Sequence, residues 1–333
     1  MIRGAARAAL AVLALCAACQ ATLGSTLSAF NFSLTTPSAS FTAAADWTAP
    51  TASAAVIGRT TAYYTGYIKQ GASYYVYANV TDTGNPASGI ENVTANVDTT
   101  TSAHPAVALV AGSYDAGGVA YNYRTAALTA NSTLASGSYA FTVTSTDKAA
   151  NAETQSFAVT VDNTAPAASD VQSTNVSGGT VGHLDQGDTL TLTYNSIIDP
   201  YSILGGWSGA STKVQVDLVD GGGSIDDSID VYNTESTPVQ IPVGTVDLGS
   251  KSYLTTGFGQ HIVYGATGAA TPSTMVQSGS SIVITLGTPG GASSTSTAHA
   301  AMIWTPSTSA TDIAGNAVSA NTATQTGATH ANF

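Results

Sequence analysis

The chain has 333 residues, only 8% of them charged, with Lys+Arg 8 against Asp+Glu 20 and a formal net charge of −12. Arg3 and Arg7 lie near the N-terminus, which leaves six of the eight basic residues for the rest of the chain. Six scattered cations cannot form a phosphate-binding stripe, so the composition excludes a nucleic-acid-binding protein. A hydrophobic content of 43% is sufficient for packed cores, so the low charge does not indicate disorder.

The N-terminal segment has the pattern of a secretory signal peptide. Arg3 and Arg7 precede an apolar run ending at Cys19, which is too short to span a bilayer. We expect residues 1–29 to be the signal peptide and cleavage zone of an exported, extracellular or cell-surface protein that has no transmembrane anchor. Cys16 and Cys19 both lie in this segment, so the mature domains would be held by packing or metal. Acylation of Cys19 is an alternative.

The next residues resemble the start of a known family. Gly24-Ser-Thr-Leu-Ser-Ala-Phe30 leads to Phe41-Thr-Ala-Ala-Ala-Asp46, and this stretch is similar to the N-terminus of the camelysin/TasA-type secreted matrix proteins. The resemblance implies a subunit of an extracellular fibre. In such a fibre, residues 30–45 would be an extended segment that adds a strand to the sheet edge of a neighbouring copy.

Two pairs of motifs indicate an internal repeat. Asp46-Trp-Thr-Ala-Pro recurs as Asp162-Asn-Thr-Ala-Pro, and Asp147-Lys-Ala-Ala-Asn recurs as Asp312-Ile-Ala-Gly-Asn. The spacing predicts two homologous units, the second with longer loops, followed by a short tail. These segments are residues 46–161, 162–327 and 328–333.

Apolar and polar residues alternate with period two between these motifs, which is typical of half-buried strands. The predicted strands include 74–80, 139–145, 157–161, 190–194, 214–218 and 282–286. Gly, Asn, Asp or Pro bounds each strand, and the mature sequence has no convincing helical stripe. The predicted fold class is therefore all-β, with two tandem β-sandwiches after the signal peptide.

Longer motifs resemble the Ig-like domains of bacterial surface proteins. Gly137–Asn151, closing on Val161–Pro166, resembles these domains. Gly187–Tyr194, with Ile198–Pro200 and Asp312–Asn316, is similar to the Ig-like modules of S-layer and adhesin chains. The resemblance implies tandem Ig-like sandwiches in a cell-surface or extracellular-matrix protein with a structural or adhesive role.

Acidic and amide side chains recur at one predicted end of each unit. In an Ig-like sandwich the first strand begins at the end where two later loops lie, so these side chains should converge. The first-unit set and its second-unit counterpart are Asp46, Asp82, Asp147 and Asn151, then Asp162, Asp199, Asp312 and Asn316. Such oxygen ligands suit Ca²⁺, and an ion at Asp162 would stiffen the two units into a rod. Aspartates that only cap turns remain the alternative.

An aromatic surface would suggest a different function. Tyr75 and Tyr77 are predicted to point outward from the strand at 74–80, and with Trp207 they could stack on sugars. This interpretation makes the chain a pair of carbohydrate-binding modules, whereas cross-strand aromatic packing explains the rings equally well.

The sequence contains no convincing catalytic motif, so we expect a protein that is not an enzyme. A secreted hydrolase would need a Ser/His/Asp or carboxylate group that forms only in three dimensions, and a cleft with His and Ser in hydrogen-bond contact would support it. The expected partners are other surface or matrix proteins, copies of the chain itself, or glycans.

Overall fold

The computed structural model describes residues 46–255, 257–297, 300–327 and 333. The predictions for the signal peptide, for residues 30–45 and for most of the tail therefore lie outside the described residues. Within them the predicted all-β class is confirmed, because strands β1–β19 and one four-residue helix, α2 (Pro200–Ile203), make up the regular structure. No helix in the described ranges has the length and apolar character needed to cross a membrane.

The first nine strands form one sheet in the order β1-β3-β6-β5-β4-β8-β9-β2, with β7 paired to β3. Their bounds are β1 Thr51–Gly58, β2 Tyr67–Ile68, β3 Ser73–Thr81, β4 Ile90–Asn96, β5 Val107–Ala116, β6 Val119–Thr125, β7 Leu128–Thr129, β8 Gly137–Asp147 and β9 Ala152–Val161. Strand β5 pairs with β4 through its first two residues and with β6 from Leu109 onward. It therefore joins two halves of the sheet, whose inward side chains share a single core.

Period-two alternation explains which side chains enter this core. On β3, Tyr74 and Val76 are fully buried, and on β8, Phe141 and Val143 are buried and packed in the same cluster. Ser145 continues the inward row of β8, and its hydroxyl donates to the carbonyl of Pro50 at 2.7 Å. The buried hydroxyl is thereby satisfied, as a sandwich core requires.

The remaining strands form a second sheet in the order β10-β11-β17-β16-β12-β13-β14-β18-β19, with β15 paired to β12. Their bounds are β10 Ala168–Thr174, β11 Thr189–Tyr194, β12 Thr212–Val219, β13 Ser228–Tyr232, β14 Thr245–Asp247, β15 His261–Tyr264, β16 Ser273–Ser278, β17 Ser281–Thr285, β18 Ile303–Thr305 and β19 Ala323–Thr324. Strand β12 begins against β16 and continues between β13 and β15, so it connects two halves here as well. In the core of this second unit, Trp304 packs edge-on against Tyr194, with 4.7 Å between the ring centroids.

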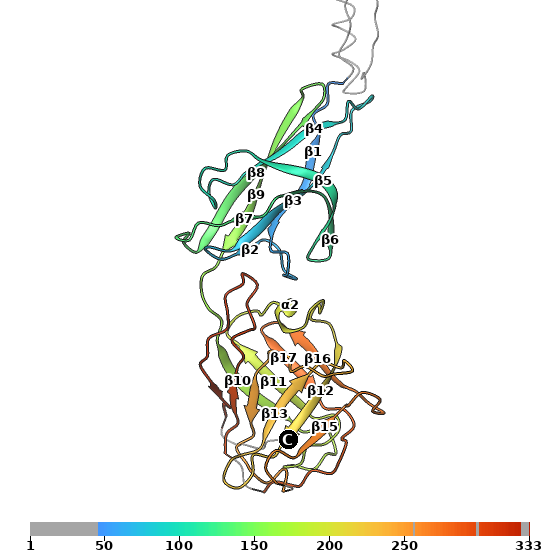
Figure 1. Cartoon of the computed structure of the whole chain (residues 1–333), viewed down its shortest axis with the longest axis vertical. Coiled ribbons are helices and arrows are strands. Elements are labelled where there is room, and N and C mark those ends of the chain that lie inside the picture. The colour runs from blue at the N-terminus through green and yellow to red at the C-terminus, as the bar shows by residue number, and fades with distance from the viewer. Residues whose placement is uncertain (1–45, 256, 298–299, 328–332) are drawn as a thin grey trace, which may run out of the picture.

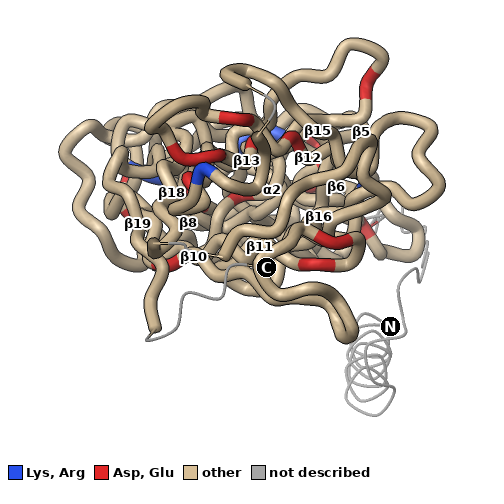
Figure 2. The backbone as a smooth tube through the Cα atoms, turned by 90° about the horizontal axis from the view of Figure 1, so that it is seen from below, with Lys and Arg blue, Asp and Glu red and all other residues tan. Residues whose placement is uncertain are grey.

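The two sheets occupy separate units along the long axis of the molecule (Figure 1). Strand β9 leads into β10, and α2 lies at the end of the second unit that faces the first (Figure 1). Seen from below, acidic segments are scattered among few basic ones, as the composition requires (Figure 2). The fold therefore places the two repeated acidic motifs at equivalent ends of two units, one distal and one at the junction.

Candidate metal centre and its counterpart at the junction

Three aspartates meet at the distal end of the first unit. Asp46 precedes β1, Asp82 follows β3 and Asp147 is the last residue of β8. One carboxylate oxygen from each lies within 4.8 Å of the others. Asp46 and Asp147 are buried and Asp82 is half-buried. The fold thus brings together the three residues that the strand order suggests from the sequence.

The carboxylate of Asp46 is held by main-chain donors. Its Oδ1 accepts the amide of Thr48 at 2.9 Å, and its Oδ2 accepts the amide of Ser88 at 2.8 Å. These N–H groups hold the pKa of Asp46 below its usual value of 3.8. The side chain is therefore charged at neutral pH and fixed in place.

Two glycines let the loop after β3 wrap around the cluster. Asp82 accepts the amide of Gly84 at 3.2 Å and the amide of Gly89 at 2.7 Å. A Cβ atom at position 84 would overlap the carboxylate of Asp46. Glycine is therefore needed at this position because the loop passes directly against the charged group.

Asn151 ties the third carboxylate to the start of the unit. Its Nδ2 donates to Asp147 Oδ2 at 2.7 Å and to the main-chain carbonyl of Asp46 at 3.2 Å. Asn151 therefore fixes Asp147 relative to Asp46. Because the amide nitrogen is turned toward these acceptors, the side chain braces the cluster, and its Oδ1 is the atom left for a ligand.

The donor set fits a hard divalent cation. Three carboxylates converge, and in the described part of the chain no Lys, Arg or His forms an ion pair with them. Ca²⁺ takes six to eight oxygen ligands, which carboxylates, carbonyls and water supply. A cation at this point would offset the mutual repulsion of the three charges.

The second unit repeats the brace. Asn316 Nδ2 donates to Asp312 Oδ2 at 2.9 Å and to the main-chain carbonyl of Asp162 at 2.9 Å. The Asp162 carboxylate accepts the amide of Thr164 two residues on, a local turn contact. These contacts match those of the first unit, so the repeated motifs build one local structure twice.

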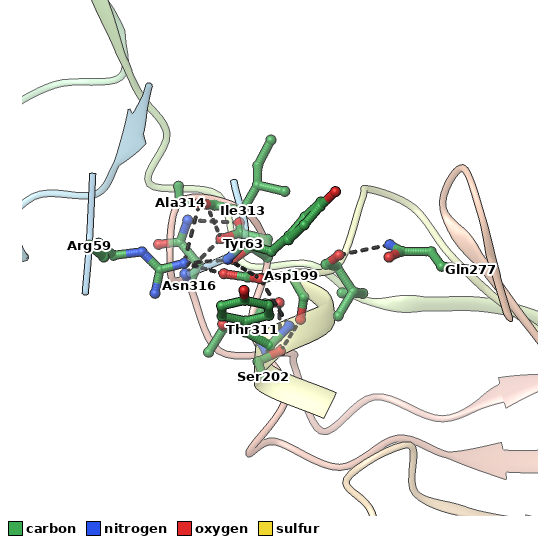
Figure 3. Close-up of polar contacts among 12 residues, drawn as sticks. Arg59, Tyr63, Asp199, Ser202, Gln277, Thr311, Ile313, Ala314 and Asn316 are labelled. Atoms are coloured by element: carbon green, nitrogen blue, oxygen red, sulfur yellow. Dashed lines mark hydrogen bonds and ion pairs between the residues drawn. The ribbon is translucent and has the colours of Figure 1, made fainter. Parts of the chain in front are cut away.

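The cation at the second cluster comes from the first unit. Arg59, directly after β1, places Nη2 2.9 Å from Asp199 Oδ2 and 3.3 Å and 3.5 Å from the carbonyls of Ile313 and Asp312 (Figure 3). The amide of Tyr63 donates to Asp199 Oδ1 at 3.0 Å (Figure 3). Both oxygens of Asp199 therefore receive donors from the preceding unit.

This arrangement differs from the Ca²⁺ site expected between the units at Asp162. Among the described residues, the carboxylates of Asp162, Asp199 and Asp312 do not converge as a metal-binding trio. The guanidinium of Arg59 stands against Asp199 instead, and a Cβ at position 315, where glycine occurs, would lie 2.8 Å from its Nη1. A positive φ of 95° also favours Gly315. The sequence gives no signal that pairs Arg59 with Asp199, 140 residues away.

Asp199 depends on Arg59 because its carboxylate is buried. The side chain of Asp199 is 1% exposed, and that of Arg59 is 16% exposed. Burial raises the pKa of Asp199, while the amides of Tyr63 and Tyr201 and the charge of Arg59 oppose this rise. A buried carboxylate without these partners would be strongly destabilising.

The aromatic residues do not form the expected sugar platform. Tyr77 is 1% exposed because Tyr121 covers it at a ring distance of 5.7 Å. The Arg124 guanidinium lies 4.6 Å from the ring of Tyr75. Trp207 is 5% exposed, and its Nε1 donates to the carbonyl three residues on. Tyr77 lies outside the main core of the unit, but residues of the β5–β6 hairpin pack on that face, so its ring is buried.

Comparisons with known proteins add little to this geometry. No protein-family model matches the chain, and no curated protein matches it. Among solved structures, dimeric latent PorU from Porphyromonas gingivalis gives a TM-score of 0.23 at 16% sequence identity. The match covers 73% of this chain and 20% of that chain, so this chain spans about a fifth of PorU. A likeness of this size carries no argument about fold or function.

Proposed function

We propose that this chain is an exported structural or adhesive protein of the cell surface or extracellular matrix, built from two Ig-like units fixed end to end. Arg59 pairs with Asp199 at the acidic end of the second unit, and the equivalent acidic end of the first unit binds Ca²⁺. The observation that carries the proposal is the repeated aspartate–asparagine cluster, which includes an ion pair to Arg59 in one copy and, among the described residues, no ion pair in the other.

Strand pairing in the first unit supports the Ig-like assignment. Strands β4, β8 and β9 are consecutive neighbours, as C, F and G are in an Ig sandwich, and β1 pairs with β3 as A does with B. The short strand β2 pairs in parallel with β9, which keeps the beginning of the unit against its last strand. In the second unit the order β10-β11-β17-β16 is that of an A-B-E-D sheet.

A structural role also fits the surface chemistry. The rings of Tyr77 and Trp207 are buried and Arg124 lies over the half-buried ring of Tyr75, so the geometry does not favour a carbohydrate-binding module pair. The partners we propose are other surface or matrix proteins, or further copies of this chain joined through residues 30–45. In either case a stiff rod presents its distal cluster away from the second unit.

Thermal unfolding of the protein in excess Ca²⁺ and in chelator tests the calcium site. An ion at about a hundred times its Kd that binds only the folded state stabilises it by roughly 2.7 kcal/mol. We expect the melting temperature to rise by several degrees with Ca²⁺ and the rise to disappear in Asp82→Asn. This variant removes one charge and keeps an acceptor for the loop amides.

Asp115→Asn is the matched control, because exposed Asp115 caps a turn of the same unit by accepting the amide of Gly118 at 3.2 Å. We expect this variant to keep the full calcium response. Equal melting temperatures in calcium and chelator for the wild-type protein would show that the aspartates only cap turns.

A further inference from the structure

A second polar group, which includes none of the acidic-cluster residues, links the loop before β11 to the loop after β17. His183 Nδ1 is 2.9 Å from Asp185 Oδ1, and Ser293 Oγ is 3.1 Å from His183 Nε2. An ionised carboxylate only accepts hydrogen bonds, so Nδ1 carries the imidazole proton and Nε2 is left to accept from the serine hydroxyl. The connectivity is serine to histidine to aspartate, at hydrogen-bond distance throughout.

A buried tyrosine lies beside the serine hydroxyl. Tyr264 is fully buried, and its hydroxyl donates to the carbonyl of Leu184 at 3.1 Å and lies 3.3 Å from Ser293 Oγ. Burial raises the pKa of Tyr264 to about 12, so its hydroxyl remains a donor. The Leu184 carbonyl can only accept, so it takes the single Tyr264 proton, and Tyr264 holds the Ser293 side chain in place by contact.

Backbone contacts hold the two loops that carry this group together. Asp185 Oδ2 accepts the amide of Thr180 at 2.7 Å, and buried Asp188 accepts the amide of Asp185 at 2.7 Å. The amide of Ser296 donates to the carbonyl of Gly182 at 2.7 Å, which joins the loop after β17 to the histidine loop. Main-chain hydrogen bonds therefore hold the two loops that carry the histidine, the aspartate and the serine.

The group is accessible from solvent. The side chains of His183 and Asp185 are 26% and 29% exposed, and Ser293 is half-buried beside exposed Gly291 and Ala292. Within the described residues, the amides of 291, 292 and 293 donate no hydrogen bond. In the proposal below, these amides are the donors to an oxyanion formed at Ser293.

We propose that Ser293, His183 and Asp185 form a nucleophilic site that cleaves uncharged carboxylic esters. Ser293 is the nucleophile, His183 the general base and Asp185 the positioning residue that holds the imidazole tautomer. This activity is separate from the structural role proposed above.

The reaction is ordinary acyl transfer. The Oγ proton of Ser293 passes to His183 Nε2 as Oγ bonds to the acyl carbon, and the alcohol leaves with that proton. Water then attacks the acyl-serine, gives a proton to His183, and the carboxylic acid leaves as the serine proton is restored. After each proton transfer to His183, Nε2 is 3.2 Å from the carbonyl of Ser293, a ready acceptor for the imidazolium.

The charge of the second unit favours an uncharged ester. Lys213 and Lys251 are the only lysines or arginines in residues 162–327, so the unit offers few cations for a carboxylate or phosphate substrate. Asp185 and Asp188 lie beside the site and repel anions. Esters are also less demanding than amides, because an alcohol leaves more easily than an amine.

A fluorophosphonate probe tests the site in the unmodified protein. It bonds phosphorus to an activated serine oxygen and releases fluoride, so peptide mass spectrometry identifies the serine without any variant. We expect one adduct, on Ser293, and turnover of p-nitrophenyl acetate that the probe abolishes. No adduct, or adducts spread over several serines, would overturn the proposal and leave the contacts as a structural clip.

Variants then separate chemistry from folding. We expect Ser293→Ala to abolish labelling and Ser294→Ala, the adjacent control, to retain it. His183→Gln and Asp185→Asn should slow labelling about 100-fold or more. Asp185→Asn should slow labelling without changing the melting temperature, because the amide oxygen of asparagine can still accept the hydrogen bond from the Thr180 amide. Labelling of these two variants at the wild-type rate would contradict the assigned roles.

Discussion

At the scale of single residues, the same Asp–Asn brace produces two different electrostatic outcomes. Main-chain amides lower the pKa of Asp46 at a site where no described basic residue forms an ion pair, whereas burial raises the pKa of Asp199 and the Tyr63 amide and Arg59 only partly oppose that rise. The brace residues Asn151 and Asn316 contact equivalent atoms in both units. The difference therefore arises from what faces each cluster and not from the cluster itself.

Gly84 gives a residue-scale test. In Gly84→Ala the new Cβ overlaps the carboxylate of Asp46, so we expect a loss of about 2 kcal/mol of unfolding free energy. The calcium-dependent rise in melting temperature should be lost as well. Gly205→Ala is the control, because its Cβ meets no atom within 4 Å. A full calcium response in Gly84→Ala would exclude Asp46 as a ligand.

At the scale of strands, alternation predicted the elements well. The predicted strands 139–145, 190–194 and 282–286 lie within or across β8, β11 and β17, with at most one residue beyond the observed end. Period two separates two faces but does not say what covers the outer one, so the burial of Tyr77 under the β5–β6 hairpin was not predictable. Convergence of the first cluster followed from strand order, because strands of a sandwich end at common edges.

The junction gives an element-scale prediction with a defined pH dependence. We expect Arg59→Met to lower the unfolding free energy by about 3 kcal/mol at pH 7, because Asp199 keeps its burial and loses its cation. Without Arg59 the folded-state pKa of Asp199 rises further above 3.8. The loss should therefore be complete at neutral pH and shrink as the pH falls toward and below 3.8, where Asp199 is protonated in both states.

Lys251→Met, which removes an exposed charge from the second unit, is the control for this variant. Its stability should match the wild type within about 0.5 kcal/mol at every pH. Chemical denaturation at pH 4, 5.5 and 7 measures these differences. A loss in Arg59→Met that does not change with pH would argue against the Asp199 contact.

At the scale of the whole molecule, the repeat predicted two equivalent ends but could not predict their different contents. The second cluster faces the first unit, which supplies Arg59 and the amide of Tyr63, and the first cluster faces away from the second unit (Figures 1 and 3). Contacts between residues this distant in the sequence produce no local sequence pattern from which they could be predicted. The Ser293–His183–Asp185 group was unpredictable for the same reason.

Calorimetric titration of the protein with Ca²⁺ tests most directly the claim that one cluster binds an exchangeable ion and the other an arginine. We expect one ion per chain, with binding abolished in Asp82→Asn and unchanged in Asp162→Asn. Two ions per chain would show that the junction also binds metal. No binding at all would contradict the calcium site and leave Arg59 as the one cation that the repeated clusters use.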